Sequence, residues 1–148
     1  MKKYYLAYGS NLNKGQMQMR CPGAVPVGTA EIKGYQLLFK GSRTGSYLTI
    51  EQKKGAVVPV GVWEVDRFHE HRLDIYEGYP SFYYKRKVKV TLKETQQEIE
   101  AFVYIMHEDR PLGIPSNFYV EVCKNGYDDF GFDKKYLRAA IKASVGGM

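Results

Sequence analysis

The amino-acid sequence predicts an α+β protein: a small, mostly antiparallel β-barrel of about six strands with flanking helices. Two observations support this prediction. Apolar and β-branched segments recur between glycine-containing turns, and amphipathic helical segments are inserted between them. Closing the sheet into a barrel would remove its unpaired edges. Residues 1–148 contain no repeat, low-complexity tract or linker, so we expect a single domain.

The first part of the chain reads as a strand, a short helix and a strand-rich region. Lys3–Tyr8 is apolar on both faces, so we expect a central strand there. A short helix should run from Asn13 to about Arg20, capped by Asn11 or Asn13. The next three strands are one with a bend at Gly34 and the two arms of a hairpin around Lys53-Lys54-Gly55: Val25–Phe39, Tyr47–Glu51 and Val57–Val65.

Two strands and three helices are expected in the remainder. Asp66 caps a helix through Tyr76 or Glu77, which ends at Gly78. Phe82–Leu92 alternates apolar and polar residues as a half-buried strand does, and the next strand is its antiparallel partner. That partner strand is expected at Ile99–His107. The two closing helices are expected from Ser116 to about Asn125, with Gly126 just after the helix end, and from Asp133 to Ala143.

Composition narrows the class of protein. The 148 residues are 44% hydrophobic and 26% charged, which is typical of a globular chain. The apolar run near the N-terminus is broken at Gly9, too early for a signal peptide or a membrane span. Cys21 and Cys123 are far apart in the sequence, which favours reduced thiols over a disulfide. We therefore expect a cytoplasmic protein without membrane contact.

The most informative motif is Tyr8-Gly9-Ser10-Asn11-Leu12, directly after the first strand. A strand that ends in Gly-Ser-Asn and enters a helical pattern presents several backbone N–H groups at one point, where they can bind a carboxylate or an oxyanion. Because Gly9 has no Cβ, a ligand can approach its main chain closely. Ser10 and Asn11 can hydrogen-bond that ligand, or they can cap the helix of an ordinary strand-to-helix turn. The pentapeptide alone leaves both interpretations open.

Glu77 is the candidate acid. It falls at the C-terminal end of its predicted helix, where the macrodipole disfavours a carboxylate anion. If Tyr76, Tyr79 and Tyr83 partly shield the Glu77 carboxylate from water, its pKa should rise, which suits a group that accepts a proton and returns it. The alternative is an exposed glutamate at a frayed helix end, and the local sequence favours that alternative.

Other chemistry has little support. His69-Glu70-His71 places two histidines on different faces of a helix, so both cannot reach one metal ion. The H-E-x-x-H, P-loop and dinucleotide-binding patterns are absent from the sequence. Ser10 lacks the G-x-S-x-G context of a nucleophile. We expect no metal and no cofactor.

Two segments together resemble the gamma-glutamylcyclotransferase-like family. These are Tyr8-Gly9-Ser10-Asn11-Leu12 and, about sixty-five residues later, Leu73-Asp74-x-x-Glu77-Gly78-Tyr79-Pro80. Three further segments match that family's pattern in the expected order: Gly34-Tyr35-x-Leu37-x-Phe39, Gly61-Val62-x-Glu64-Val65 and Pro115-Ser116-x-x-Tyr119. The resemblance covers nearly the whole chain.

The resemblance implies a cofactor-free cyclotransferase, an acyltransferase of glutathione metabolism, that acts on a small γ-glutamyl substrate. The substrate's α-amine attacks its own γ-carbonyl, and 5-oxoproline and an amine are released. Glu77 aligns with the family's general acid/base. Tyr83 matches an aromatic position after the acid, although Tyr84 beside it leaves the register open. The residues that the resemblance assigns to the glutamyl group are Tyr8, Gly9, Ser10 and Asn11. A monomer or a homodimer is expected.

Two other functions remain as alternatives. A net charge of +6 and the cluster Lys85-Arg86-Lys87-Val88-Lys89 are compatible with a small basic barrel that binds an anionic metabolite or a nucleic acid without catalysis. The solvent face of a strand explains that cluster more simply, so nucleic-acid binding is the weaker hypothesis. The same pocket could also serve hydrolysis or another acyl transfer.

Overall fold

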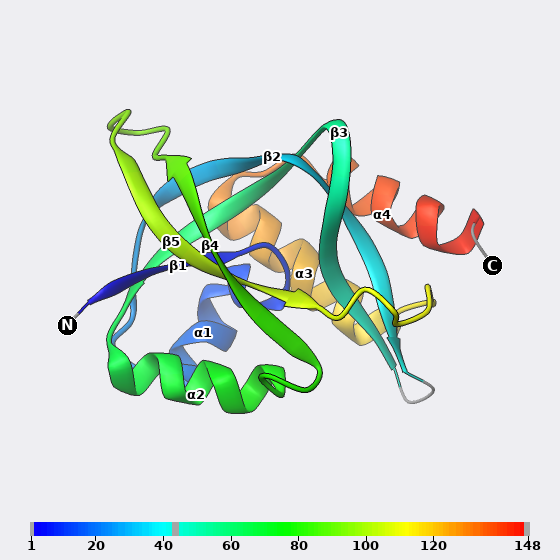
Figure 1. Cartoon of the computed structure of the whole chain (residues 1–148), viewed down its shortest axis with the longest axis horizontal. Coiled ribbons are helices and arrows are strands. Elements are labelled where there is room, and N and C mark those ends of the chain that lie inside the picture. The colour runs from blue at the N-terminus through cyan, green and yellow to red at the C-terminus, as the bar shows by residue number, and fades with distance from the viewer. Residues whose placement is uncertain (1, 43–44, 147–148) are drawn as a thin grey trace.

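The computed structural model describes residues 2–42 and 45–146, and a five-stranded sheet organises them (Figure 1). The strand order is β2-β3-β1-β5-β4. The pairs β1–β3, β2–β3 and β4–β5 are antiparallel, whereas β1 and β5 run parallel. The strands are β1 (Lys3–Ala7), β2 (Val25–Ser42), β3 (Gly45–Val65), β4 (Tyr83–Thr91) and β5 (Glu98–Met106). The α+β class is thus confirmed, with β1 at the centre as its apolar sequence predicts.

The predicted barrel is wrong, because the sheet does not close. β2 and β4 are its two edges, and no ladder joins them. β2 and β3 pair with each other along most of their length and curl over the remaining strands as a bent two-stranded arm (Figure 1). The β2 edge is covered at two places. The turn after β4 meets it at Thr29, where Thr29 N and Oγ1 donate to Glu94 and Lys93 N donates to Thr29 O. Near the other end of β2, the segment before α3 forms an antiparallel bridge to it, in which Gly41 N donates to Pro111 O and Gly113 N donates to Phe39 O. Local hydrogen bonds thus take the place of barrel closure.

The predicted hairpin around Lys53-Lys54-Gly55 is also wrong, because β3 runs through these residues without reversing. The pairing register shifts here: Lys33 faces Val57, but Tyr35 faces Gln52. Residues 53–56 are therefore the extra residues of an irregularity opposite Gly34, which has a φ of +80°. The bend expected at Gly34 is present, and the six predicted strands become five.

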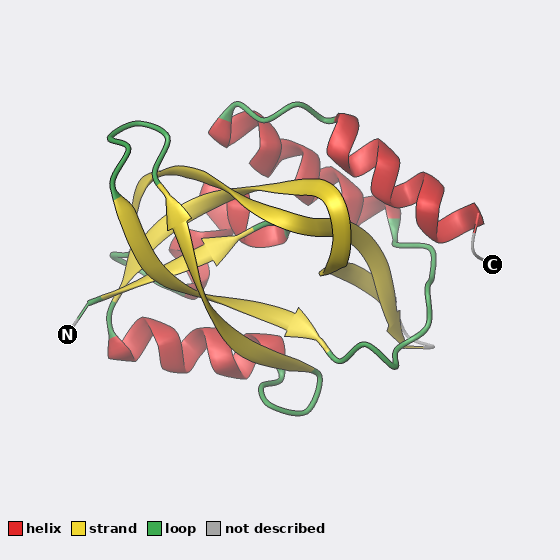
Figure 2. Cartoon of the chain, turned by 45° about the horizontal axis from the view of Figure 1, so that its top comes forward, coloured by secondary structure: helices red, strands yellow, loops and turns green. Residues whose placement is uncertain are grey.

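The helices lie around the sheet (Figure 2). Among them, α3 packs along η1 and α4 along β2. Their bounds are η1 (Ser10–Leu12, a 3-10 turn), α1 (Lys14–Arg20), α2 (Arg67–Glu77), α3 (Asn117–Phe130) and α4 (Lys135–Gly146). The side chains of Asn13, Asp66 and Ser116 accept hydrogen bonds at the N-termini of α1, α2 and α3, as predicted. Among the described helices, none is long and apolar enough to span a membrane.

Gly126 does not end α3, contrary to prediction. The helix continues to Phe130 and ends at Gly131, whose φ is +73°. Gly126 lies buried inside the helix because η1 crosses it closely: a Cβ there would lie 2.6 Å from Asn13 N. This glycine thus allows α3 to hold the turn that follows β1.

Candidate active site

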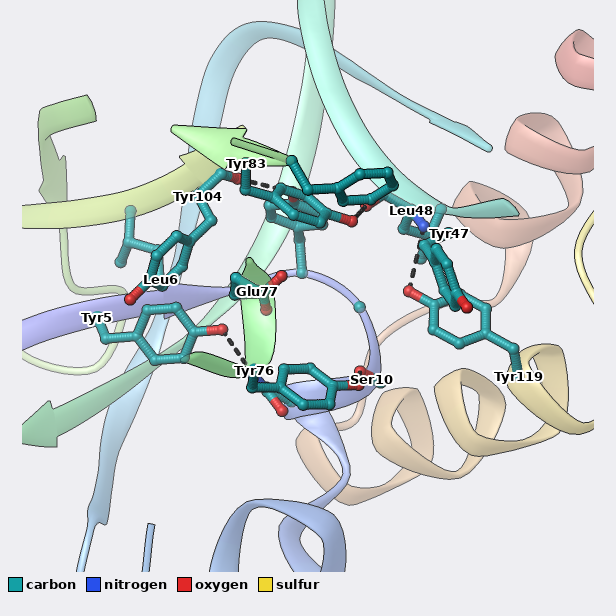
Figure 3. A pocket seen from close by; sticks show the side chains of 14 residues that line it. Tyr5, Leu6, Ser10, Tyr47, Leu48, Tyr76, Glu77, Tyr83, Tyr104 and Tyr119 are labelled. Carbon is teal, nitrogen blue, oxygen red and sulfur yellow. Dashed lines mark hydrogen bonds between the residues drawn. The ribbon is translucent and has the colours of Figure 1, made fainter. Parts of the chain in front are cut away.

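A cavity of about 230 Å³ lies where β1 passes into η1 and α2 ends (Figure 3). The six residues to which the family resemblance assigns a role all line this cavity, although they come from three separate segments of the chain: Tyr8, Gly9, Ser10, Asn11, Glu77 and Tyr83. The other lining residues are mainly aromatic and come from β1, β3, α2, β5, α3 and the turn before β4. The full lining is Tyr5, Leu6, Tyr8, Gly9, Ser10, Asn11, Tyr47, Leu48, Tyr76, Glu77, Phe82, Tyr83, Tyr104 and Tyr119.

The turn after β1 is held tightly and leaves its N–H groups free. Leu12 N donates to Gly9 O at 3.0 Å and thereby closes the 3-10 turn. No described residue accepts a hydrogen bond from the backbone N–H of Gly9, Ser10 or Asn11. Gly9 has a φ of −128°, so a left-handed backbone does not explain the glycine; the close packing around it leaves little room for a Cβ. A Cβ there would lie 3.2 Å from the hydroxyl oxygen of Tyr119.

A chain of polar contacts ties this turn to α1 and α2. The Oδ1 of Asn11 accepts a hydrogen bond from Arg20 at 2.6 Å, and its Nδ2 donates to the Tyr5 hydroxyl at 2.9 Å. The Arg20 guanidinium lies 3.6 Å from the ring centroid of Tyr76, whose hydroxyl is 3.3 Å from Ser10 Oγ. The Asn11 side chain is therefore committed to protein groups rather than open to a ligand.

Glu77 is the last residue of α2, and its carboxylate points into the cavity (Figure 3). Gly78 ends the helix in the left-handed conformation, as predicted, and turns the chain away behind the acid. Burial raises the pKa of Glu77 from 4.5 to about 8, and the positive charge of Arg20 offsets part of that rise. No described residue hydrogen-bonds its carboxylate. The group can therefore accept or donate a proton near neutral pH.

Among the aromatic residues after the acid, Tyr83 faces the cavity and Tyr84 does not. The Tyr83 hydroxyl donates to Leu48 O at 2.8 Å, whereas Tyr84 points outward and hydrogen-bonds Glu108. Tyr79, expected on the cavity wall, is not among the lining residues: it is 40% exposed and packs beside Tyr104. The alternation of side chains along β4 thus places Tyr83, and not Tyr84, on the cavity wall.

Several residues that line the cavity were not identified as candidates from the sequence. Tyr119 belongs to the Pro115-Ser116-x-x-Tyr119 segment, so a signal for it was present. Tyr5 and Tyr104 carry no such signal, because only the parallel pairing of β1 and β5 brings them together, with ring centroids 5.8 Å apart. Arg20 reaches the site because α1 packs against α2.

Lys85 of the basic cluster and His69 of the histidine pair have structural partners. Lys85 forms ion pairs with Glu70 at 2.8 Å and with Asp74 at 3.0 Å, which joins β4 to α2. His69 completes the cap of α2: its Nδ1 accepts from Asp66 N at 3.2 Å. Within residues 2–42 and 45–146, no group of three or more histidine, cysteine or acidic side chains is placed to hold a metal ion.

A protein-family comparison matches residues 5–121 to the model described as "Gamma-glutamyl cyclotransferase, AIG2-like". The chain belongs to this family. It is 32% identical to the gamma-glutamylcyclotransferase of Homo sapiens over 142 residues, which cover 89% of this chain and 73% of that protein. The gamma-glutamyl cyclotransferase-like resemblance inferred from the motifs is thereby confirmed.

Solved structures agree with this assignment. A structure titled "Gamma-glutamyl cyclotransferase" is 29% identical, has a TM-score of 0.81, and aligns over 95% of this chain and 86% of its own. A crystal structure of an uncharacterized Homo sapiens protein is also 29% identical, with a TM-score of 0.83 and coverage of 94% and 86%. The chain is accordingly an enzyme of the cyclotransferase kind.

Proposed function

We propose that this cyclotransferase converts a γ-glutamyl compound into 5-oxoproline and a free amine. The observation that carries the proposal is the placement of Glu77. Its carboxylate has a raised pKa, hydrogen-bonds none of the described residues, and lines the same cavity as the Gly9–Asn11 turn. A cavity of about 230 Å³ is small for a ligand site, which fits one glutamyl group and part of its leaving amine.

In the proposed reaction, Glu77 moves a single proton. The anionic carboxylate accepts a proton from the substrate's α-amine as the amine nitrogen bonds to the γ-carbonyl carbon. The carbonyl becomes a tetrahedral oxyanion, and the N–H groups of the turn stabilise its charge. Glu77 then returns the proton to the leaving nitrogen, and the carbon–nitrogen bond breaks. No covalent bond to the protein forms at any step.

The remaining predicted residues bind and orient the glutamyl group. Gly9, Ser10 and Asn11 supply backbone N–H groups for its carbonyl or carboxylate. Tyr8 and Tyr83 form rigid walls, because their hydroxyls are fixed on the backbone oxygens of Tyr104 and Leu48. A wall of fixed rings holds the substrate in the folded conformation that brings its amine to its own carbonyl, which accounts for much of the acceleration in such cyclisations.

We further propose that residues 1–148 work as one domain in the cytoplasm. One continuous cluster of buried apolar side chains joins the sheet to the helices. Cys21 and Cys123 are both buried and unpaired, which suits a reducing compartment.

The test is Glu77→Gln, assayed by 5-oxoproline release from a panel of γ-glutamyl dipeptides, γ-glutamylamines and glutathione. Gln keeps the size of the side chain but cannot accept the proton, so kcat should fall by about 10²–10⁴-fold. Glu98→Gln is the matched control, because Glu98 is exposed on β5 and should leave kcat unchanged. A Glu77→Gln variant with near-native kcat would remove Glu77 from the mechanism.

A further inference from the structure

The tyrosines of the cavity differ in whether a protein group accepts a hydrogen bond from their hydroxyl. Tyr8 donates to Tyr104 O at 2.7 Å, and Tyr83 donates to Leu48 O at 2.8 Å, so both hydrogens are committed to the protein. The Tyr5 hydroxyl oxygen instead accepts a hydrogen bond, from Asn11 Nδ2. No described residue accepts the hydrogen of Tyr5.

Arg20 fixes this arrangement. A guanidinium has only donors, so the Asn11 oxygen must face Arg20 and the Asn11 NH₂ group must face Tyr5. Arg20 is itself held on both sides, because its backbone oxygen accepts from Arg72 and its guanidinium stacks on the Tyr76 ring. The Asn11 amide therefore cannot turn over, and the free hydrogen of Tyr5 is left for a group inside the cavity.

The position of Tyr5 suits a donor to the reacting carbonyl. Tyr5 is 4% exposed, and its ring packs on Phe102 and Tyr104, with centroid distances of 5.5 and 5.8 Å. Its hydroxyl, which hydrogen-bonds Asn11, points into the cavity on the side of the Glu77 carboxylate (Figure 3). Burial, and then the charge of Glu77, raise the pKa of Tyr5 well above its usual value, so the hydroxyl keeps its hydrogen at working pH.

We propose that Tyr5 donates a hydrogen bond to the γ-carbonyl oxygen of the substrate as that oxygen becomes an oxyanion, and that Arg20, acting through Asn11, is the positioning residue for this donor. The inference rests on the proposed cyclisation. Tyr5 transfers no proton: its hydrogen bond strengthens as negative charge develops on the carbonyl oxygen and relaxes when the leaving amine departs.

The first test is Tyr5→Phe, which keeps the ring and removes the donor. Because the hydrogen bond strengthens only in the transition state, kcat should fall by about 10²-fold while KM changes less than about twofold. A loss confined to KM, or a kcat within about threefold of the wild type, overturns the role of Tyr5. Thermal unfolding of the variant shows whether the core is intact.

The second test separates Arg20 from a structural role. Arg20→Met should lower kcat. With each protein assayed on the plateau of its own pH profile, the double variant with Tyr5→Phe should be little slower than Tyr5→Phe alone, because both changes remove the same donor. Fully additive losses overturn the positioning role. Arg20→Lys, which keeps the charge, is measured in parallel in case the Met variant does not fold. Arg67→Met is the control, since Arg67 is exposed on α2.

The pH profile of kcat gives an independent readout. Arg20 is the charge that lowers the pKa of Glu77, so Arg20→Met should move the midpoint of the profile upward, whereas Tyr5→Phe should leave it in place. An unmoved midpoint in Arg20→Met contradicts the electrostatic part of the role. The charged and titratable groups around Glu77 are Arg20 on α1, Tyr76 on α2, Tyr5 and Tyr8 at β1, Tyr83 on β4, Tyr104 on β5 and Tyr119 on α3.

Failure of this inference can be told apart from failure of the proposed function. If the wild type releases no 5-oxoproline from any γ-glutamyl compound in the panel, the cyclisation itself is refuted, and the role of Tyr5 with it. If the wild type is active and Glu77→Gln is not, but Tyr5→Phe keeps its kcat, only the role of Tyr5 is refuted.

Discussion

Glu77 should destabilise the folded protein at alkaline pH, and Glu77→Gln should restore that stability. Burial raises the pKa of its carboxyl from 4.5 to about 8. Below pH 4.5 the group is neutral in both the folded and the unfolded chain, so it carries no penalty. Between pH 4.5 and 8 the unfolded chain releases the proton while the folded protein retains it, so stability is lost as pH rises and the loss is complete above pH 8.

The size of the effect follows from the two pKa values. At about 1.4 kcal/mol per pH unit, the difference between 4.5 and about 8 sets an upper limit of about 5 kcal/mol. Because Glu77 is only half-buried and the cavity opens to solvent, about 2–3 kcal/mol is the expected loss. For a chain of 148 residues, this corresponds to roughly 5–10 °C in Tm.

The assay is thermal unfolding of the wild type and Glu77→Gln at pH 5 and pH 9. We expect the variant to unfold roughly 5–10 °C above the wild type at pH 9 and within a few degrees of it at pH 5. Glu98→Gln should show no such difference, because Glu98 is exposed on β5. Equal Tm values for Glu77→Gln and wild type at pH 9 would refute the raised pKa, and with it the reason for assigning the acid/base role to this residue.

Two further predictions concern glycines. Gly9→Ala should lower kcat/KM at least tenfold while Tm falls by only a few degrees, because the new Cβ presses on the Tyr119 hydroxyl at 3.2 Å inside the cavity. Adding Tyr119→Phe to the Gly9→Ala variant should relieve that contact. Comparable, small effects of Gly9→Ala on activity and on Tm would contradict this prediction. Gly126→Ala should destabilise the protein by about 2 kcal/mol or more despite the helical preference for alanine, whereas Gly15→Ala, at an exposed position of α1, should be neutral or stabilising. Denaturant unfolding of both variants checks this prediction. A stabilised Gly126→Ala variant would show that η1 does not pack on α3 as described.

The sequence predicted the parts of the site that depend on local chemistry. A strand followed by Gly9-Ser10-Asn11 and a helix ended by Gly78 after Glu77 are both short-range patterns, and the structure places both at one cavity. The link between them required the family resemblance, because no local rule relates residues about sixty-five positions apart.

The features that were missed depend on tertiary packing. Lys53-Lys54-Gly55 has the composition of a turn, yet the long partner strand β2 keeps β3 extended through it, with an irregularity opposite Gly34. Gly126 looks like a helix end, but close contact with η1 explains it instead. Arg20 and Tyr5 become functional candidates only when α1 and β1 meet at Asn11, which no sequence period reveals.

The most direct test of the central claim is the fate of the γ-carbonyl in water enriched in ¹⁸O. Cyclisation takes its nucleophile from the substrate's own amine, whereas hydrolysis takes it from solvent. We expect mass spectrometry to show unlabelled 5-oxoproline and one equivalent of amine from the wild type, and almost none of either product from Glu77→Gln. Glutamate carrying ¹⁸O as the main product, or equal turnover by the two proteins, would contradict the proposed mechanism.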